Sequence, residues 1–453
     1  MKKRFTSARV PGTGMEQLFS TPARWQAWLD VEAALARAQA DLGLIPADAG
    51  KAITRACDLD RLDQDRINAE IDRTSHPLMP LIAELGRAAD QYGGWVHWGA
   101  TTQNITQTGD TLLLRRAHTI IRGQITDILT VLAELTERGA EMIMAGRTHG
   151  QHAVPITFGF KTAGWIDEYV RHLDRLDQIS PRLFVALLGG AAGTSASLGE
   201  DPDTLQRAVA TNLGLTPMAV PSRSISDHFA EFVTVLGLIA TTSGKIGREI
   251  YQLMKTEYHE VEEPVPAGTV GSSTMPHKRN PQLCQDIIGM TAEIRALVPL
   301  ALESAISEHD ADNAPSALFD VEQHACELTA ETLSRIHLIV SGLQLDPRRM
   351  RSNLDLSGGM IASEAIMLRL GETIGRQLAH EVVYDAAQTA STTATSFTDA
   401  LAVDPRVTSQ LDTDTIKNLL QPDSHLGLAP AIAHHQAIRA REIVVSRGEN
   451  DRR

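Results

Sequence analysis

The chain has 453 residues, 43% of them hydrophobic and 22% charged, which is typical of a globular protein with a large core and two or three domains. Its formal net charge of -14 argues against nucleic acid as a partner, because phosphate binding favours a basic surface. The three cysteines form no CxxC pair, which argues against a zinc knuckle. The basic N-terminus lacks an apolar signal core, and no apolar run could span a bilayer, so we expect a cytoplasmic protein with no membrane partner.

Apolar residues recur at helical spacing along most of the chain. A first helix is predicted within residues 22–46, and a second within residues 110–144, far longer than the globular average. Further long helices are predicted for residues 158–179, 227–261 and 282–328. The last of these contains Pro299 and Pro315, where it is expected to kink or break. Few segments alternate with a period of two, so little sheet is expected.

Several long helices with wide apolar faces predict an all-α fold built around a bundle. One chain is too small to cover faces of this width, so we expect helices shared with other subunits. Residues 1–97 are predicted to form an N-terminal helical domain. The central long-helix bundle domain is predicted to span residues 98–345, and a C-terminal helical domain residues 346–453.

Three polar segments interrupt the apolar pattern. The first polar segment is HWGATTQNITQTGD (97–110), the second is GRTHGQHAVP (146–155) and the third is GTVGSSTMPHKRNP (268–281). Each lies at an end or turn of a predicted helix, where free N–H groups favour anions. Thr101 and Thr102, taken alone, are more simply explained as a helix cap. Three such segments in one chain favour a composite site for an anion.

Small and cationic residues dominate the third polar segment. Gly268 and Gly271 permit backbone angles that let a loop swing or its amides converge. Lys278 supplies a positive charge and Asn280 an amide. A serine here could act as a base only if amides and a cation stabilised its oxyanion, and a mobile loop could deliver it to a substrate. The alternative is a glycine-rich surface loop, and the spacing excludes a Walker motif.

His149 lies between Thr148 and Gln151 in the second polar segment. A lone histidine is usually structural, but beside these residues it could bind an anion or act as an acid or base near neutral pH. His149 and His152 form an HxxH pair without an obvious third ligand. We therefore expect no metal site.

Together the three segments resemble the signatures of the fumarase/aspartase superfamily, which includes argininosuccinate lyase, adenylosuccinate lyase and 3-carboxy-cis,cis-muconate cycloisomerase. The match of GSSTMPHKRNP is highly specific, and HWGATTQNITQT and GRTHGQHAVP resemble the other two signatures. The resemblance covers most of the chain. Residues 15–46 and the segment RMRSNLDLSGGMIASEA are most similar to the bacterial cycloisomerase branch.

This resemblance implies a three-domain, all-helical subunit in a homotetramer built around a core of long helices, with each active site formed by three subunits. It also implies an elimination without a cofactor. A base removes the proton next to a carboxylate and gives an aci-carboxylate. The bond to nitrogen or oxygen on the neighbouring carbon then breaks, which typically releases fumarate.

The resemblance also implies roles for single residues. Ser272 would be the base, with Ser273 beside it. Lys278 and Asn280 would bind the carboxylate that becomes the aci-carboxylate, which needs donors and a cation in place. Thr101 and Thr102 would bind the other carboxylate. Thr148, His149 and Gln151 would complete the anion site, and His97 would lie on the side of the leaving group. Among these, His149 is the candidate acid.

Departures from the family pattern bear on the substrate. Where adenylosuccinate lyases carry phosphate-binding arginines, residues 308–322 have no arginine and several carboxylates, which argues against adenylosuccinate. Cycloisomerases usually lack the histidine that matches His149, and they carry an arginine where this chain has Ser226. Asn104 and Gln107 replace two aspartates of the first signature. Because Asn104 and Gln107 are neutral, the site lacks two carboxylates that would raise the pKa of a nearby histidine. This weakens the assignment of His149 or His97 as the acid.

The leading hypothesis is a lyase that cleaves a C–N bond in a substituted succinate, and the alternative is a lactonising carboxymuconate cycloisomerase. A second alternative is an inactive structural relative, which the retained site residues disfavour. Asp310 and Asp312 are slightly better explained as solvated surface charges. A contact with an amine-bearing leaving group is the competing hypothesis for them.

Overall fold

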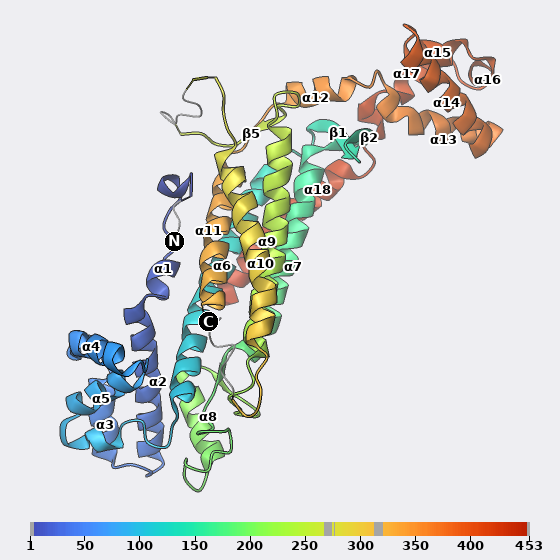
Figure 1. Cartoon of the computed structure of the whole chain (residues 1–453). Coiled ribbons are helices and arrows are strands. Elements are labelled where there is room, and N and C mark those ends of the chain that lie inside the picture. The colour runs from blue at the N-terminus through green and yellow to red at the C-terminus, as the bar shows by residue number, and fades with distance from the viewer. Residues whose placement is uncertain (1–3, 267–273, 276, 312–319, 451–453) are drawn as a thin grey trace.

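The computed structural model describes residues 4–266, 274–275, 277–311 and 320–450, and it is an elongated, largely helical molecule (Figure 1). A bundle of long helices separates a smaller N-terminal cluster from a C-terminal one. The bundle consists of α6 (Thr102–Arg138), α7 (Phe158–Leu183), α9 (Asp227–Leu253), α10 (Gln282–Ser304), α11 (Val321–Gly342) and α18 (Ala429–Asn450). The all-α class is confirmed, and strands in the described ranges form only two-stranded sheets.

The longest helix, α6, begins earlier and ends earlier than its apolar pattern predicted. Thr101 and Asn104 form a capping box at its start, so the polar residues after Thr101 are helical. Its 37 residues give a length of about 55 Å. The chain then turns into a hairpin of β1 (Ile143–Thr148) and β2 (Gln151–Thr157), which occupies residues predicted as the end of the helix.

The predicted helix over residues 282–328 is two helices. α10 continues through Pro299 and ends at Ser304, and α11 begins at Val321. Pro315 lies outside the described residues. The two helices pack against each other and against α9, so both belong to the bundle. Their adjacent ends are therefore held close to the start of α6 and to the loop before α9.

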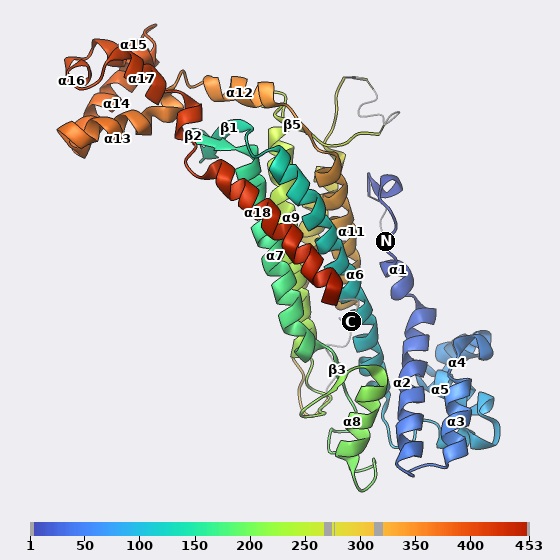
Figure 2. The same ribbon diagram turned by 180° about the vertical axis from the view of Figure 1, so that it is seen from behind.

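The last helix, α18, returns to the bundle and packs against α6 and α7 (Figure 2). Its alanines at positions 433, 437 and 440 are fully buried, which allows the close approach. The C-terminal segment is therefore divided between two hydrophobic cores. The three predicted domain ranges stay a prediction.

The N-terminal cluster has its own hydrophobic core, which also includes the start of α6. Its elements are α2 (Thr21–Asp41), α3 (Ala47–Ala56), η2 (Leu59–Arg61), α4 (Gln64–Thr74), α5 (Met79–Ala88) and η3 (Asp90–Trp95). Two elements precede it, η1 (Ser7–Arg9) and α1 (Met15–Leu18), and Met15 of α1 is buried in the core of the bundle. The long connection between α7 and α9 packs on the N-terminal core and contains β3 (Val185–Ala186), α8 (Pro202–Leu213) and β4 (Thr216–Pro217).

The C-terminal cluster packs around a separate core. The chain reaches it through β6 (Gln344–Leu345), which follows α11 and pairs with β5 (Val261–Glu262). The remaining elements are α12 (Pro347–Asp355), η5 (Met360–Ala362), α13 (Ser363–Ile374), α14 (Arg376–Thr392), α15 (Phe397–Val403), α16 (Pro405–Thr408), α17 (Thr413–Leu419) and η6 (Pro422–His425).

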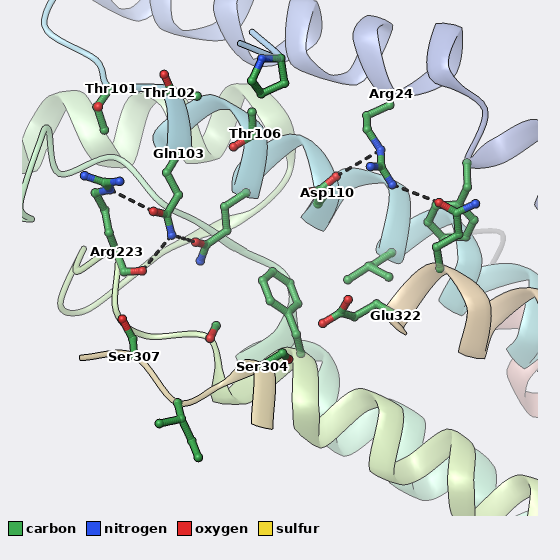
Figure 3. A pocket seen from close by; sticks show the side chains of 18 of the residues that line it. Arg24, Thr101, Thr102, Gln103, Thr106, Asp110, Arg223, Ser304, Ser307 and Glu322 are labelled. Carbon is green, nitrogen blue, oxygen red and sulfur yellow. Dashed lines mark hydrogen bonds and ion pairs between the residues drawn. The ribbon is translucent and has the colours of Figure 1, made fainter. Parts of the chain in front are cut away.

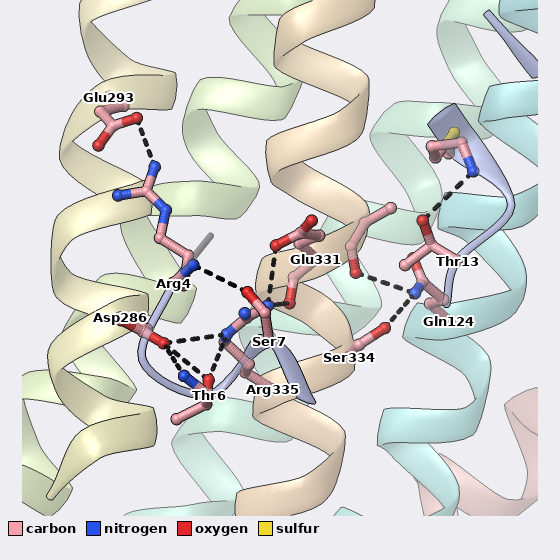
Figure 4. Close-up of polar contacts among 12 residues, drawn as sticks. Arg4, Thr6, Ser7, Thr13, Gln124, Asp286, Glu293, Glu331, Ser334 and Arg335 are labelled. Carbon is pink, nitrogen blue, oxygen red and sulfur yellow. Dashed lines mark hydrogen bonds and ion pairs between the residues drawn. The ribbon is translucent and has the colours of Figure 1, made fainter. Parts of the chain in front are cut away.

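A buried polar network ties the N-terminal segment to the bundle (Figure 4). Thr6 donates through its N and Oγ1 to Asp286 Oδ2, at 2.9 and 2.7 Å. Arg335, which is fully buried, donates from Nε to Thr6 Oγ1 at 2.9 Å and from Nη1 to Glu331. Because buried charges are stable only when paired, this network fixes where the chain enters α1 and α2.

Among the described helices, α9 alone is long and apolar enough to cross a membrane. Of its most apolar window, 67% is buried inside the bundle. Packing in the protein core therefore accounts for its composition.

Candidate functional site

A cavity of about 540 Å³ lies at the N-terminal end of α6 (Figure 3). Its walls come from α2, the first turns of α6, the loop before α9, the end of α10 and the start of α11. The polar lining residues used below are Arg24, Thr101, Thr102, Gln103, Thr106, Gln107, Asp110, Arg223, Glu322 and Gln323. Those on α6 recur at three- and four-residue steps, so one face of the helix points into the cavity.

Thr101 and Thr102 lie at the start of α6, and both line the cavity. Asn104 Oδ1 accepts from Thr101 N at 3.2 Å and from Gly190 N at 3.1 Å, which anchors the cap to a glycine-rich loop. The threonines are thus both a helix cap and part of a cavity wall. The free N–H groups and the positive end of the helix dipole favour an anion at this end.

A polar network crosses the cavity wall beside the threonines. Gln103 Nε2 donates to Gln107 Oε1 at 2.9 Å and to the Arg223 carbonyl at 2.8 Å. Arg223 Nε donates in return to Gln103 Oε1 at 2.9 Å, and Nη1 donates to the Ala191 carbonyl. The neutral Gln107 therefore has a structural partner here. Arg223 brings a cation close to the anion-favouring end, and the sequence analysis did not identify it.

The other end of the cavity is acidic. Asp110 Oδ1 lies 3.8 Å from Arg24 Nε, and Arg24 Nη2 donates to Gln323 Oε1 at 3.1 Å. Burial raises the pKa of Asp110 to about 7, even though Arg24 favours its ionised form. Burial likewise raises the pKa of Glu322 to about 7. Thr102 and Asp110 are eight residues apart on α6, which separates the two ends by about 12 Å along the helix.

His97 is oriented by a buried carboxylate. Its Nδ1 lies 2.6 Å from Glu32 Oε1, and Glu32 is 1% exposed. Nδ1 is therefore the ring nitrogen that faces this carboxylate, and the contact fixes the orientation of the ring. The backbone at His97 has a φ of 60°, an uncommon conformation for a residue with a side chain. The sequence analysis missed Glu32, although a carboxylate on the apolar face of a predicted helix was a usable signal.

The second polar segment forms the tip of the β1–β2 hairpin. Thr148, His149 and Gln151 are exposed, and His149 and Gly150 have φ values of 52° and 76°, which suit a tight hairpin turn. At the base of the tip, Arg147 pairs with the fully buried Glu260 at 3.0 and 2.6 Å. A buried ion pair therefore supports the hairpin next to its exposed tip.

Further contacts hold this base. Asn353 Nδ2 donates to Glu260 Oε1 at 2.8 Å, which ties α12 to the same carboxylate. The guanidinium of Arg147 lies 4.9 Å from the ring centroid of Tyr258, a distance typical of a cation–π contact. The hairpin lies at the opposite end of α6 from Thr101 and Thr102 (Figure 1). A single chain therefore does not bring the first and second polar segments together.

Of the third polar segment, the described residue Arg279 pairs with Glu262 of β5 at 2.7 Å, at the same end of the bundle as the hairpin (Figure 1). Ser272 and Ser273 lie outside the described residues. Lys278 is exposed and Asn280 is half-buried. The end of the segment is fixed by the buried Glu263, whose carboxylate accepts from Leu283 N at 3.0 Å and from Cys284 N at 3.1 Å. This carboxylate caps the start of α10.

Across the described ranges, no group of three or more His, Cys, Asp or Glu side chains could hold a metal ion. The three cysteines are free thiols and are buried. Burial raises the pKa of the Cys284 and Cys326 thiols well above the usual range.

Known proteins resemble the chain over almost its whole length. Residues 8–296 match a family model described as lyase, and residues 359–435 match one described as adenylosuccinate lyase C-terminus. N-acetyl-S-(2-succino)cysteine lyase of Dickeya dadantii (strain 3937) is 37% identical over 418 residues, which is 92% of each chain. The 3-carboxy-cis,cis-muconate cycloisomerase of Pseudomonas aeruginosa is 37% identical over 434 residues, covering 94% of this chain and 95% of the relative.

A solved structure agrees with these matches. The crystal structure of a fumarate lyase from Mesorhizobium sp. BNC1 has a TM-score of 0.88 and 34% identity to this chain. It covers 93% of this chain, and this chain covers 97% of it. The similarity therefore concerns the fold of almost the whole chain.

Proposed function

This chain is an enzyme of the fumarase/aspartase superfamily, and we propose that it is a lyase that releases fumarate from a substituted succinate by anti β-elimination. The observation that carries the proposal is the cavity at the start of α6. Its lining combines the Thr101 and Thr102 hydroxyls, a helix N-terminus and the Arg223 guanidinium, a set of donors suited to a carboxylate. We place the enzyme in the cytoplasm, where its three free thiols would stay reduced.

The proposed chemistry is acid–base catalysis without a cofactor. Ser272 removes a proton from C3 of the succinate, and the electron pair passes to the adjacent C4 carboxylate as an aci-carboxylate. Lys278 and Asn280 stabilise the second negative charge. The electrons return to form the C2–C3 double bond, the bond from C2 to the leaving group breaks, and the leaving group takes a proton from His149.

Three subunits are proposed to build each site in a homotetramer. Within one chain, about 55 Å of α6 separates Thr101 from the hairpin that carries Thr148, His149 and Gln151. A small dicarboxylate can contact both sets only if they come from different chains. The exposed hairpin tip and the exposed Lys278 support this assembly, since both are available to contact another subunit.

We propose that the bond that breaks joins C2 of the succinate to a nitrogen atom of the leaving group. The similarity to a lyase named for a 2-succino cysteine supports sulfur as a second choice on the same C2 position. Lactonisation of a carboxymuconate is the alternative function. It is supported by the 37% identity to a cycloisomerase over most of both chains.

An activity screen tests the function. The purified protein is incubated with aspartates substituted on nitrogen, with S-(2-succino)cysteine derivatives and with 3-carboxy-cis,cis-muconate, and fumarate and lactone are followed separately. We expect fumarate from a substituted succinate. Lactone alone would favour the cycloisomerase, and neither product from an intact tetramer would favour an inactive relative.

Two serine variants test the base. Ser272→Ala should lower kcat by at least about 10³-fold without changing assembly, because it removes the proposed base. Ser273→Ala is the matched neighbour and should retain most of the activity. If Ser273→Ala is the inactive variant, the base assignment passes to Ser273.

A further inference from the structure

The cavity at the start of α6 differs in charge between its two ends. Donors and the positive helix end lie at Thr101 and Thr102, and the carboxyls of Asp110 and Glu322 lie at the other end (Figure 3). About 12 Å of helix separates Thr102 from Asp110. A ligand that fills the cavity therefore meets anion-favouring groups at one end and carboxyls at the other.

The cavity is also larger than fumarate requires. Its volume of about 540 Å³ lies in the range of sites that enclose ligands of drug size. A four-carbon diacid bound at Thr101 and Thr102 leaves the Asp110 end for the substituent. In a β-elimination that substituent is the leaving group.

We propose that Asp110 and Glu322 form the leaving-group subsite and select a leaving group with a cationic amine at its far end. This inference rests on the proposed function and names its substrate class. It differs from a contact by Asp310 or Asp312, because Asp110 and Glu322 lie on the cavity wall itself. Both are specificity residues, and neither has a role in the proton transfers.

The charge balance at this end favours a cation. One guanidinium, that of Arg24, lies beside both carboxyls, and it also donates to Gln323. The carboxylate of Asp320 adds further negative charge nearby. Burial raises the pKa of Asp110 and of Glu322 to about 7, so in the empty cavity ionisation is costly near neutral pH. A bound ammonium would stabilise the ionised pair and gain charge-assisted hydrogen bonds.

Three matched ligands test the inference on the full chain. N-(4-aminobutyl)aspartate carries the amine, N-pentylaspartate replaces the ammonium by a methyl group, and N-(4-carboxybutyl)aspartate carries a carboxylate. Affinities are measured by calorimetry on the Ser272→Ala variant, so binding is seen without turnover. The amine ligand should bind at least about tenfold more tightly than the pentyl ligand, as expected for a charged hydrogen bond.

Variants locate the preference. In the Ser272→Ala background, Asp110→Asn and Glu322→Gln should each reduce the preference for the amine severalfold. Asp127→Asn removes an exposed carboxylate from the same helix, away from the cavity, and should leave the preference unchanged. Equal affinities for the amine and pentyl ligands, or a preference that survives both cavity variants, would overturn the inference. Tightest binding of the carboxylate ligand would also overturn the inference, because Arg24 would then bind an acidic leaving group.

Failure of the proposed function is seen separately. Wild-type enzyme is assayed for fumarate release from all three aspartates. No fumarate from any of them argues against the lyase, while the calorimetric comparison still decides whether the subsite takes an amine. Fumarate from all three at the same kcat/KM supports the lyase and contradicts the subsite.

Discussion

The candidate site residues lie in different surroundings at the two ends of α6. At its N-terminal end, Gln103, Gln107 and Arg223 bond to one another and to the backbone beside a cavity. At the hairpin end, the supporting pair Arg147 and Glu260 is buried, but the candidate residues of the tip are exposed. One end is a walled cavity, whereas at the other end the candidate residues face outward from a buried support. The proposed assembly, in which the hairpin end completes a site against another chain, accounts for this difference.

The largest expected effect comes from joining the two ends across subunits. A Thr101→Ala/Thr102→Ala double variant and the Ser272→Ala variant should each be nearly inactive as pure proteins. Unfolding them together and refolding should restore activity in roughly a quarter of the sites, the fraction that random pairing makes intact in both segments. Fumarate release measures the recovery.

The control for this experiment is a mixture of the two variants that were refolded separately. It should stay inactive if subunits exchange slowly. If mixed tetramers form and activity still does not return, all the segments of one site come from one chain, which contradicts the proposed assembly.

The buried support of the hairpin should be sensitive to loss of one charge. Glu260→Ala leaves Arg147 and Asn353 without their shared acceptor, and we expect a loss of about 3–5 kcal/mol in the free energy of unfolding. Chemical denaturation measures it. Glu262→Ala is the matched control two residues away, because its partner Arg279 is 60% exposed and the pair is worth about 1 kcal/mol or less. Equal losses in the two variants would contradict a special role for Glu260.

The cavity end should show its own dependence on pH. The pKa of Asp110 is raised from 3.8 to about 7, so its contribution to stability is complete below pH 4 and is lost as pH rises through 7. The loss is on the order of a few kcal/mol. Asp110→Asn cannot ionise. Its melting temperature should therefore match that of the wild type near pH 3.5, lie above it by pH 5 and exceed it most near pH 8.

Neighbouring charges are part of this prediction, because Arg24 favours ionisation of Asp110, whereas Glu322 and Asp320 oppose it. Asp127→Asn removes an exposed carboxylate from the same helix. The difference between its melting temperature and that of the wild type should be the same at each of these pH values. An Asp110→Asn variant that behaves in the same way would show that Asp110 ionises normally in the folded protein.

The apolar pattern predicted the long helices but placed the start of α6 too late, because tertiary contacts hold its first turns. Gln103, Asn104 and Thr108 are polar and read as a loop. Their partners are Arg223, Gly190 and Leu187, which lie 120, 86 and 79 residues away in the chain. The local apolar pattern does not report contacts between residues so far apart in the chain. These polar residues therefore could not be assigned to a helix from the pattern.

The same distinction applies to the candidate site. Thr101, His149 and Lys278 belong to short segments with recognisable signatures, so they could be named from the sequence, and their roles stay predictions. Arg24 and Glu322 reach the cavity only because α2 and α11 pack beside α6. Their function depends on distance and burial, and neither is encoded in a short motif.

The smallest expected effect concerns the orientation of His97. Glu32 holds Nδ1 of its ring at 2.6 Å, and we infer that Glu32 positions the histidine without touching substrate. Glu32→Gln keeps an acceptor but removes the charge. The charge-assisted bond becomes a neutral one, about 1 kcal/mol weaker, so kcat should fall about fivefold.

The kinetic constants separate positioning from general damage. A misoriented ring loses contacts made in the transition state, so Glu32→Gln should lower kcat with little change in KM or in melting temperature. Glu84→Gln is the matched control, since Glu84 is another buried carboxylate of the N-terminal cluster but pairs with Arg66 and Arg87. It should leave kcat unchanged. A fall in kcat that comes only with a lower melting temperature would reduce Glu32 to a packing role.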